Sequence, residues 1–339
     1  MRYARQRVAT RDGVEHRLVV SGNGGATWWD VRRGIVELEL ARGATPAGAL
    51  RLAAALAPGS LSAALAGGGR FEDVVSEVVG AEPDAAEVSA DGFANAIDPA
   101  SYRDFMVFEE HFSFGYRWQG KPVPEVMYEL PVSYAGDPLS FIGPGDEIPW
   151  PAYTERLDYE LELGIVIGKQ GTDLTPETAL DHVLGLTILN DVSARDIQGR
   201  EMTGGLGPSK GKHFACVTGP VVVSLDELPP SMAMRASVNG EVLCDARSDE
   251  MVWSIAEIVA WASQGENLAP GALLGSGTCN GGSTIELGRT LGPGDEIVLE
   301  IEQLGTLRNT LGTPARSAWN PRTRSRNSDG TSGEHHFLT

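Results

Sequence analysis

Three acidic residues alternate with apolar residues over positions 157–163. In a β-strand this spacing puts Asp158, Glu160 and Glu162 on one face and the apolar side chains on the other. On alternation alone, the commoner structure is a half-buried antiparallel strand with a solvated acidic face. The apolar run over 164–168 is instead suited to a central, buried strand, where neighbouring carboxylates need a compensating cation. We therefore expect a cation beside these acids.

A further acid follows a second apolar run. Residues 185–190 are predicted to form a strand, so Asp191 is expected at a strand end. If the polar stretch that follows is helical, Arg195 and Gln198 stand four and seven residues after Asp191 and lie on one face with it. Three polar groups would then converge. The pattern fits equally well an Asp that starts a helix and forms a surface ion pair with Arg195.

A histidine and a lysine are the other residues of chemical interest. His111 stands seven residues after Asp104, which is about two helical turns, so the two would share a face if the segment is helical. This makes His111 the best general-base candidate, although a single histidine is more often structural. Lys212 is one of only four lysines, which makes chemistry specific to lysine worth testing, although a solvated loop lysine is the ordinary alternative.

The chain divides into regions that are predicted to form different elements. Residues 1–98 are expected to be a small α/β domain with alanine-rich helices around 46–57 and 70–79. Short strands separated by turn signals then indicate a β-rich domain over 99–316. The segment 317–339 is rich in Arg, Ser, Asn and Gly and is predicted to be disordered.

Two local signals within the second region predict definite elements. Asn239 and Gly240 stand between β-prone residues and are typical of a two-residue hairpin turn. Ser254 and Glu257 form a capping-box pattern, which predicts a helix that ends near Ser263.

Composition excludes several classes of protein. The net charge of -19 repels phosphate backbones, so nucleic acid is not an expected partner. The three cysteines are odd in number and widely spaced, which indicates neither a disulfide framework nor a zinc cluster. The sequence lacks both an apolar run long enough to span a membrane and the apolar core of a secretory signal. We therefore expect a cytoplasmic protein with no membrane partner.

Taken together, these segments resemble the fumarylacetoacetate hydrolase family over about residues 102–312. The specific feature is the order of the motifs along the chain, which is that of the family. These motifs are Asp104-Phe with His111 seven residues later, Leu130-Pro-Val-Ser-Tyr134, Leu157-Asp-Tyr-Glu-Leu-Glu162, Asn190-Asp-Val-Ser-Ala-Arg-Asp-Ile-Gln198, Gly211-Lys212, Ser276-Gly-Thr278 and Ile285-Glu286. The resemblance implies an α+β, β-rich fold, the mixed β-sandwich roll of that family, with a smaller N-terminal domain.

The resemblance also implies a role for each candidate site residue. The metal ligands would be Asp104, Glu160, Glu162 and Asp191, whereas Asp158 is not a ligand in the family. Four hard oxygen donors suit Mg²⁺, Mn²⁺ or Ca²⁺ rather than zinc. The catalytic residues would be His111, Glu286 and Lys212. The substrate-binding residues would be Tyr134, Arg195, Gln198 and Thr278.

In this scheme His111, oriented by Glu286, deprotonates a water, and Lys212 stabilises the oxyanion. The implied activity is hydrolysis of a C–C bond in an acylpyruvate-like or 1,3-diketo acid through a metal-bound enolate. The alternative on the same site is a tautomerase or isomerase, or a decarboxylase of a β-keto acid of the oxaloacetate type. A catalytically idle member that binds a metal and a small acid is a further possibility.

Two other expectations come from the resemblance. Met106 stands where the best-understood hydrolases of the family carry a tyrosine, so one hydrogen bond to the substrate is missing. Dimers are usual in the family, and a homodimer is therefore expected. The expected ligand is a small keto acid or 1,3-dicarbonyl compound.

Overall fold

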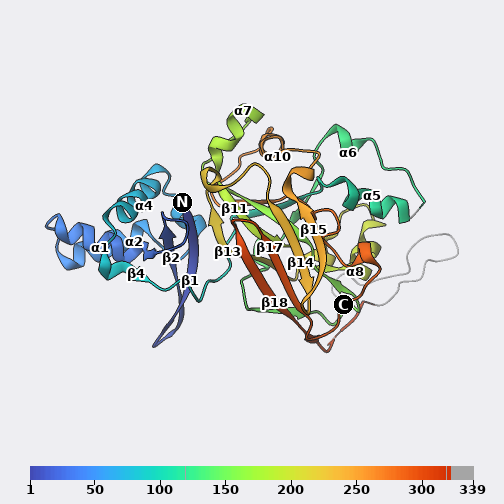
Figure 1. Cartoon of the computed structure of the whole chain (residues 1–339), viewed down its shortest axis with the longest axis horizontal. Coiled ribbons are helices and arrows are strands. Elements are labelled where there is room, and N and C mark those ends of the chain that lie inside the picture. Colours follow the sequence, from blue (N-terminus) through green and yellow to red (C-terminus); the bar gives the residue numbers. More distant parts are fainter. Residues whose placement is uncertain (119, 318, 322–339) are drawn as a thin grey trace, which may run out of the picture.

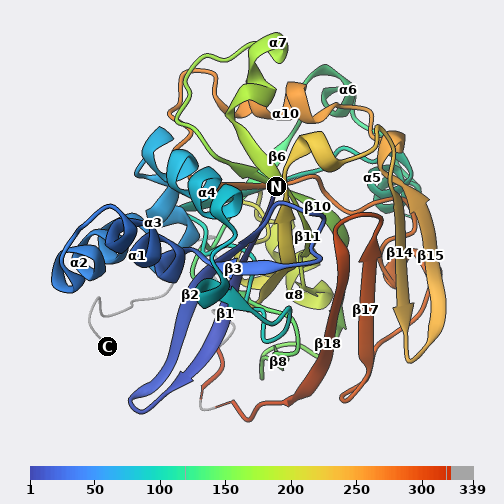
Figure 2. The same cartoon turned by 60° about the vertical axis from the view of Figure 1, so that its left-hand side comes forward.

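The computed structural model describes residues 1–118, 120–317 and 319–321. The segment predicted to be disordered, 317–339, therefore lies outside the described residues except for positions 317 and 319–321. Strands and helices are mixed throughout the described part of the chain, which agrees with the predicted β-rich α+β class. Figures 1 and 2 show the N-terminal helices on one side and the strands of two sheets on the other.

Two large sheets carry the fold. The first has the order β4-β3-β2-β1-β13-β11-β10-β16-β5-β6 with β7 paired to β13, and the second has the order β15-β14-β17-β18-β8. A small ribbon pairs β12 with β9. The strands of the first sheet are β1 (Arg2–Thr10), β2 (Gly13–Ser21), β3 (Trp28–Asp30), β4 (Glu87–Val88), β5 (Ser101–Phe105), β6 (Ser133–Gly136), β7 (Phe141–Ile142), β10 (Leu161–Ile167), β11 (Val183–Asn190), β13 (Cys216–Val223) and β16 (Ala272–Gly275). The others are β8 (Glu147–Trp150), β9 (Leu157–Asp158), β12 (Ser193–Ala194), β14 (Ala233–Val238), β15 (Glu241–Arg247), β17 (Glu296–Ile301) and β18 (Gly305–Pro314).

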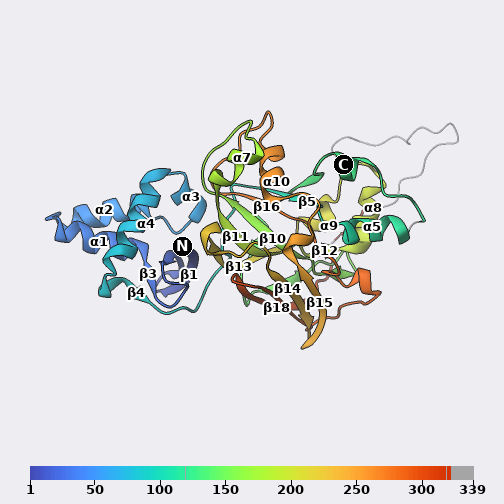
Figure 3. The same ribbon diagram turned by 45° about the horizontal axis from the view of Figure 1, so that its top comes forward.

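Helices lie at both ends of the molecule. In Figures 1 and 3, α1, α2 and α4 lie at one end, and α5 and α8 lie at the opposite end. The α-helices are α1 (Val31–Ala41), α2 (Pro46–Leu56), α3 (Leu61–Leu65), α4 (Gly69–Ala81), α5 (Glu109–Trp118), α6 (Val126–Glu129), α7 (Pro176–Ala179), α8 (Arg195–Met202), α9 (Ser209–Lys212) and α10 (Ile255–Ala262). Short 3₁₀ turns are η1 (Asp84–Ala86), η2 (Leu180–His182), η3 (Leu225–Glu227), η4 (Ser248–Glu250) and η5 (Ile285–Leu287).

The N-terminal strands are part of the first large sheet. β1 pairs antiparallel with β13, with Arg2 opposite Val223 and Tyr3 opposite Val222. The alanine-rich helices predicted in this region are confirmed as α2 and α4. The first sheet runs without a break from the N-terminal strands into those that follow, so the sheet itself marks no boundary at residue 98. The boundary placed there stays a prediction.

β10 is buried on both faces, as the apolar run over 164–168 predicted. Leu163 and Ile165 belong to the larger hydrophobic cluster, which also takes in strands of the second sheet such as β17. Val166 belongs to the other cluster, which contains Phe71 and Val78 of α4. A strand with side chains in two cores must be apolar on both faces, so a charged residue on it needs a partner.

The local signals of the second region are confirmed. Asn239 and Gly240 join β14 to β15 with φ values of 51° and 81°, the left-handed conformation that such a turn requires. Ser254 and Glu257 form the capping box that starts α10. All three cysteines are buried free thiols. Among the described residues, no helix is both long and apolar enough to cross a membrane.

Candidate active site

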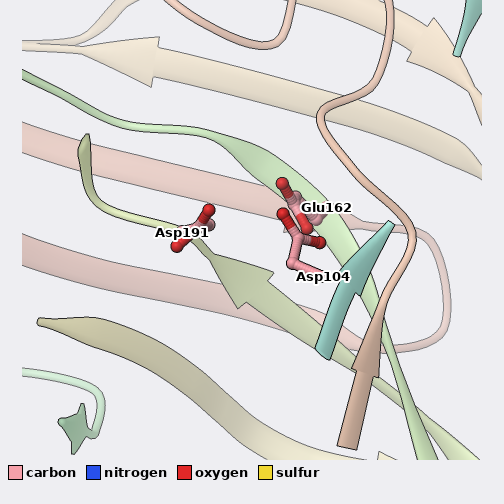
Figure 4. A group of neighbouring side chains, drawn as sticks. All are labelled: Asp104, Glu162 and Asp191. Atoms are coloured by element: carbon pink, nitrogen blue, oxygen red, sulfur yellow. The ribbon is translucent and has the colours of Figure 1, made fainter. Parts of the chain in front are cut away.

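Three carboxylates converge where neighbouring strands of the first sheet come together (Figure 4). Asp104 near the end of β5, Glu162 on β10 and Asp191 directly after β11 each offer an oxygen, and these oxygens lie within 4.8 Å of one another. All three residues are buried. We call them the acidic triad.

A glycine on β16 lets the acidic triad form. β16 lies between β10 and β5 in the sheet, and its Gly275 pairs with Gly164 on one side and with Asp104 on the other. A Cβ atom at position 275 would stand 2.2 Å from Oδ1 of Asp104 and 2.8 Å from Oε2 of Glu162. Because glycine has no Cβ, the two carboxylates can approach each other across this strand. Sequence reasoning missed Gly275, whose only signal was its place just before the Ser276 motif.

The electrostatics of the acidic triad favour a bound cation. Burial, and then the charge of Asp191, raises the pKa of Asp104 well above its usual value. Burial, and then the charges of Asp104 and Asp191, likewise raises the pKa of Glu162. Burial also raises the pKa of Asp191, although Lys212 opposes that effect. Buried carboxylates that repel one another are stabilised by a hard divalent cation, so this set of oxygen donors fits Mg²⁺, Mn²⁺ or Ca²⁺.

Glu160 lies beside the acidic triad and is paired with two cations. Its carboxylate lies 2.6 Å from Nη1 of Arg195 and also accepts a hydrogen bond from Nζ of Lys212. Burial acts to raise the pKa of Glu160, but Arg195 and Lys212 outweigh it and lower that pKa. The role of Glu160 as a fourth metal ligand stays a prediction, since its charge is already compensated.

Lys212 is buried at the C-terminal end of α9. Its ammonium group donates to both Glu160 and Asp191, and it lies 5.8 Å from the centre of the Tyr134 ring. The alternative of a solvated loop lysine is therefore wrong. Burial acts to lower the pKa of Lys212, but the two carboxylates outweigh it, so the ammonium stays charged beside the acidic triad.

His111 lies between two carboxylates. Its Nδ1 is 3.1 Å from Oε2 of Glu286, although the two groups are not aligned as a hydrogen bond, and its Nε2 is 3.8 Å from Oε1 of Glu160. Burial acts to raise the pKa of Glu286, but His111 and Ser283 are among the groups that outweigh it. The structure thus brings together the predicted pair of His111 and Glu286.

The prediction that Asp104 and His111 share one face of a helix is nevertheless wrong. Asp104 lies on β5 and His111 on α5, so the segment is not one helix and the two residues share no helical face. The strand ends at Phe105, and α5 begins only at Glu109. Tertiary packing, and not helical spacing, brings His111 to the site.

The expectation for Arg195 also needs correction. Residues 191–194 are not helical, and α8 begins at Arg195 itself. Among the described residues, the ion pairs of Arg195 are with Asp158 and Glu160, whereas Asp191 pairs with Lys212. The solvated acidic face is wrong as well, because the alternating acids over 157–163 are all buried.

A cavity of about 320 Å³ is lined by two residues of the acidic triad, Asp104 and Glu162, whereas Asp191 is not among its lining residues. Its polar lining residues are Asp104, His111, Tyr116, Ser133, Tyr134, Glu160, Glu162, Gln198, Lys212 and Thr278. Its apolar lining includes Met106, Val126, Met127, Val132 and Met202. Arg195 and Glu286 do not line it and lie behind Glu160 and His111. Sequence reasoning missed the apolar wall except for Met106.

The predicted substrate-binding residues differ in how they contact the site. Tyr134 donates its hydroxyl to Oδ2 of Asp191 at 2.7 Å, and Thr278 donates to Oε1 of Glu162 at 3.4 Å. Gln198 accepts a hydrogen bond from Arg195 at 3.1 Å. The substrate contacts of these residues stay predictions.

Comparison with known proteins identifies the family. The model of the family described as "Fumarylacetoacetate (FAA) hydrolase C-terminal" matches residues 102–312, which is more than half of the 339 residues. The protein belongs to this family, and the resemblance noted in the sequence is confirmed.

Several curated relatives carry the name oxaloacetate tautomerase. YisK of Bacillus subtilis is 36% identical over 188 residues, which are 54% of this chain and 62% of that protein. The human mitochondrial FAHD2A is 35% identical over 198 residues, which are 57% of this chain and 61% of that protein. The matched region thus spans about three fifths of the length of each relative.

Solved structures confirm the fold. A fumarylacetoacetate hydrolase from Exiguobacterium antarcticum is 25% identical, with a TM-score of 0.67, and the match covers 92% of this chain and 99% of that one. A fumarylpyruvate hydrolase from Pseudomonas aeruginosa, in complex with Mn²⁺ and pyruvate, is 25% identical with a TM-score of 0.55, over 63% of this chain and 90% of that one. The mixed β-rich fold of the family is therefore that of this chain.

Proposed function

We propose that this protein is a divalent-metal-dependent tautomerase that interconverts the keto and enol forms of a small 2-keto acid of the oxaloacetate type. The observation that carries the proposal is that Asp104 and Glu162 of the acidic triad line the same cavity as His111 and Lys212, and that an oxygen of Asp191 lies within 4.8 Å of theirs. The names of the curated relatives support tautomerisation over the hydrolysis first expected.

In this proposal the metal ion is Mg²⁺ or Mn²⁺, held by Asp104, Glu162 and Asp191, with Glu160 as a fourth donor. Bound there, the metal would polarise the keto oxygen of the substrate and lower the energy of an enolate. The need of the acidic triad for positive charge supports this assignment.

The side chains of the cavity would then move one proton. Nε2 of His111 accepts a proton from the carbon next to the keto group, and Glu286 on Nδ1 stabilises the imidazolium that forms. Lys212 places a positive charge beside the oxygen on which negative charge develops, and that oxygen takes up the proton in the enol. Tyr134, Gln198 and Thr278 orient the acid from the cavity wall.

Hydrolysis of a C–C bond in an acylpyruvate-like acid is the second candidate. The observation in its favour is the pair of His111 and Glu286, which can also deprotonate a water. The apolar wall formed by Met106, Met127 and Met202 offers space for an acyl substituent.

One experiment separates the two reactions. The protein is stripped of metal, reloaded with Mg²⁺ or Mn²⁺, and incubated with enol oxaloacetate and with acylpyruvates. Conversion of the enol is followed by its ultraviolet absorbance, and products are identified by mass spectrometry. We expect metal-dependent isomerisation without a change of mass. Metal-dependent formation of two acids from an acylpyruvate, with no effect on enol oxaloacetate, would instead establish the hydrolase.

The same assay tests the proton-transfer residue. His111→Asn should lower kcat by about 10²- to 10⁴-fold, the usual contribution of general acid–base catalysis. His182→Asn is the matched control, because His182 lies outside the cavity and contacts the Lys169 carbonyl oxygen. Equal activity of the two variants would rule out His111 as the base.

The homodimer and the cytoplasmic location stay predictions. Light scattering tests the first, and cell fractionation tests the second.

A further inference from the structure

One more buried acid lies behind the cavity. Asp158 ends β9 and is 1% exposed, yet it neither lines the cavity nor belongs to the acidic triad. Its two carboxylate oxygens accept hydrogen bonds from two segments that are far apart in the sequence. The contacts of these segments show what the carboxylate does.

The first segment is the turn that carries Glu286. Oδ1 of Asp158 accepts from the backbone N–H of Thr284 at 2.9 Å and from its hydroxyl at 2.5 Å. Oδ2 accepts from the backbone N–H of Ile285 at 3.1 Å. These three bonds hold the backbone immediately before Glu286, the residue that lies against Nδ1 of His111.

The second segment is the start of α8. Nε of Arg195 donates to Oδ2 of Asp158 at 2.9 Å, and Nη2 lies 2.8 Å from the same oxygen without hydrogen-bond alignment. Nη1 of the same guanidinium lies 2.6 Å from Oε1 of Glu160. That Oε1 atom is the one that lies 3.8 Å from Nε2 of His111.

Together these contacts link Asp158 to both nitrogens of the His111 imidazole. One route runs through residues 284–285 and Glu286 to Nδ1, and the other runs through Arg195 and Glu160 to Nε2. We propose that Asp158 is a positioning residue for His111. It fixes Glu286 on the Nδ1 side through residues 284–285, and it fixes Glu160 on the Nε2 side through Arg195. Its effect on turnover rests on the proposed function, whereas its effect on the imidazole does not.

A carboxylate suits this place better than any neutral side chain. The groups that meet Asp158 are all donors, and one of them, Arg195, is a buried cation. An asparagine has the same shape, but its amide group would turn a donor toward these donors and leave the guanidinium undercompensated. The turn before Glu286 and the guanidinium that holds Glu160 would then be free to shift, whereas the hydrogen bonds of Asp158 do not reach the acidic triad.

Asp158→Asn in the full-length, metal-loaded protein tests the proposal. We expect kcat to fall by about 10- to 100-fold, as for other residues that orient a site residue, with smaller changes in KM and in Mn²⁺ affinity. We also expect the side-chain ¹⁵N signals of His111, recorded with Mg²⁺ bound, to move. Thr284→Val removes only the hydroxyl hydrogen bond to Asp158, so it should shift the same signals by a smaller amount. This variant replaces Asp158→Asn in the test if Asp158→Asn does not fold.

The matched control is Asp30→Asn. Asp30 is also 1% exposed, accepts a backbone N–H from Arg33 and pairs with Arg17, but it lies at the start of α1. The Asp30→Asn substitution should lower the melting temperature and leave kcat and the His111 signals unchanged.

Two outcomes would overturn the proposal. One is an Asp158→Asn protein that melts lower but keeps its kcat and its His111 signals, because Asp158 would then only stabilise the fold. The other is unmoved His111 signals in both Asp158→Asn and Thr284→Val. If the wild-type protein turns over no keto acid, the proposed function fails, but the signals of His111 still decide whether Asp158 positions it.

Discussion

The four carboxylates predicted as metal ligands differ in their positive partners. Glu160 contacts both Arg195 and Lys212, whereas Lys212 reaches only Asp191 among the acidic triad. Glu162 is fully buried and has its pKa raised by burial and by the two acids beside it. The uncompensated negative charge is therefore concentrated on the acidic triad, where a divalent cation would have its largest effect.

Glu162→Gln should accordingly act in opposite directions on metal binding and on metal-free stability. We expect Mn²⁺ affinity, measured by calorimetry, to fall by more than the roughly 10- to 100-fold that follows loss of an outer partner of a metal ligand. The melting temperature of the metal-free protein should rise, because one of three mutually repelling buried charges is gone.

The control for this prediction is Glu300→Gln on β17, where the side chain is exposed. It should leave both quantities unchanged. A metal-free Glu162→Gln protein that melts lower than the wild type would mean that the acidic triad is not under electrostatic strain.

At the scale of single elements, β16 determines whether the acidic triad can form. β16 is parallel to β5 and antiparallel to β10, and it carries no side chain at the point where Asp104 and Glu162 meet. The adjacent backbone N–H of Gly277 lies 3.2 Å from an oxygen of each. The strand thus leaves space for the two carboxylates, and the residues after it donate to them.

Gly275→Ala should therefore distort the acidic triad, which is the proposed metal site. The added methyl group would lie 2.2 Å from Oδ1 of Asp104, so this carboxylate must move. We expect the loss of stability typical of overpacking, about 1–3 kcal/mol, together with weaker Mn²⁺ binding. Urea unfolding and calorimetry measure the two effects.

Gly80→Ala is the matched control for that substitution. Gly80 lies in α4, and a Cβ atom there meets nothing within 4 Å. The change should be neutral or stabilise the protein by about 0.5–1 kcal/mol. Normal metal binding by Gly275→Ala would show that the space at β16 is not needed.

At the scale of the whole molecule, the first sheet joins the N-terminal unit to the strands of the site. β1 pairs with β13, which pairs with β11, and β11 ends directly before Asp191. One hydrophobic cluster contains both Val20 of β2 and Val166 of β10. We therefore expect the two regions to unfold together.

Val20→Asp tests this cooperativity. The side chain is 1% exposed, so an uncompensated charge there should cost about 3–5 kcal/mol. Hydrogen exchange followed by mass spectrometry should show faster exchange in β10 as well as in β2. Val14→Asp, on the same strand but 66% exposed, is the control and should change neither. Faster exchange confined to β2 would mean that the N-terminal unit folds independently.

The sequence by itself determined the features that depend on neighbouring residues. Alternation of acids with apolar residues, followed by the apolar run of β10, predicted buried carboxylates that need a cation. The turn at Asn239 and the capping box at Ser254 predicted their elements because these signals act within four residues. The order of the motifs indicated the family and brought His111, Lys212 and Glu286 into one hypothesis.

Only the tertiary structure decided which of these residues meet. Arg195 is adjacent in sequence to the Asp191 segment, yet it pairs with Asp158 and Glu160. His111 reaches the site from α5, and Gly275 makes room for the acidic triad from a strand more than a hundred residues away from Glu162 along the chain. Periodicity fixes the face on which a side chain lies, but its partner depends on the order of strands in the sheet, which long-range packing sets.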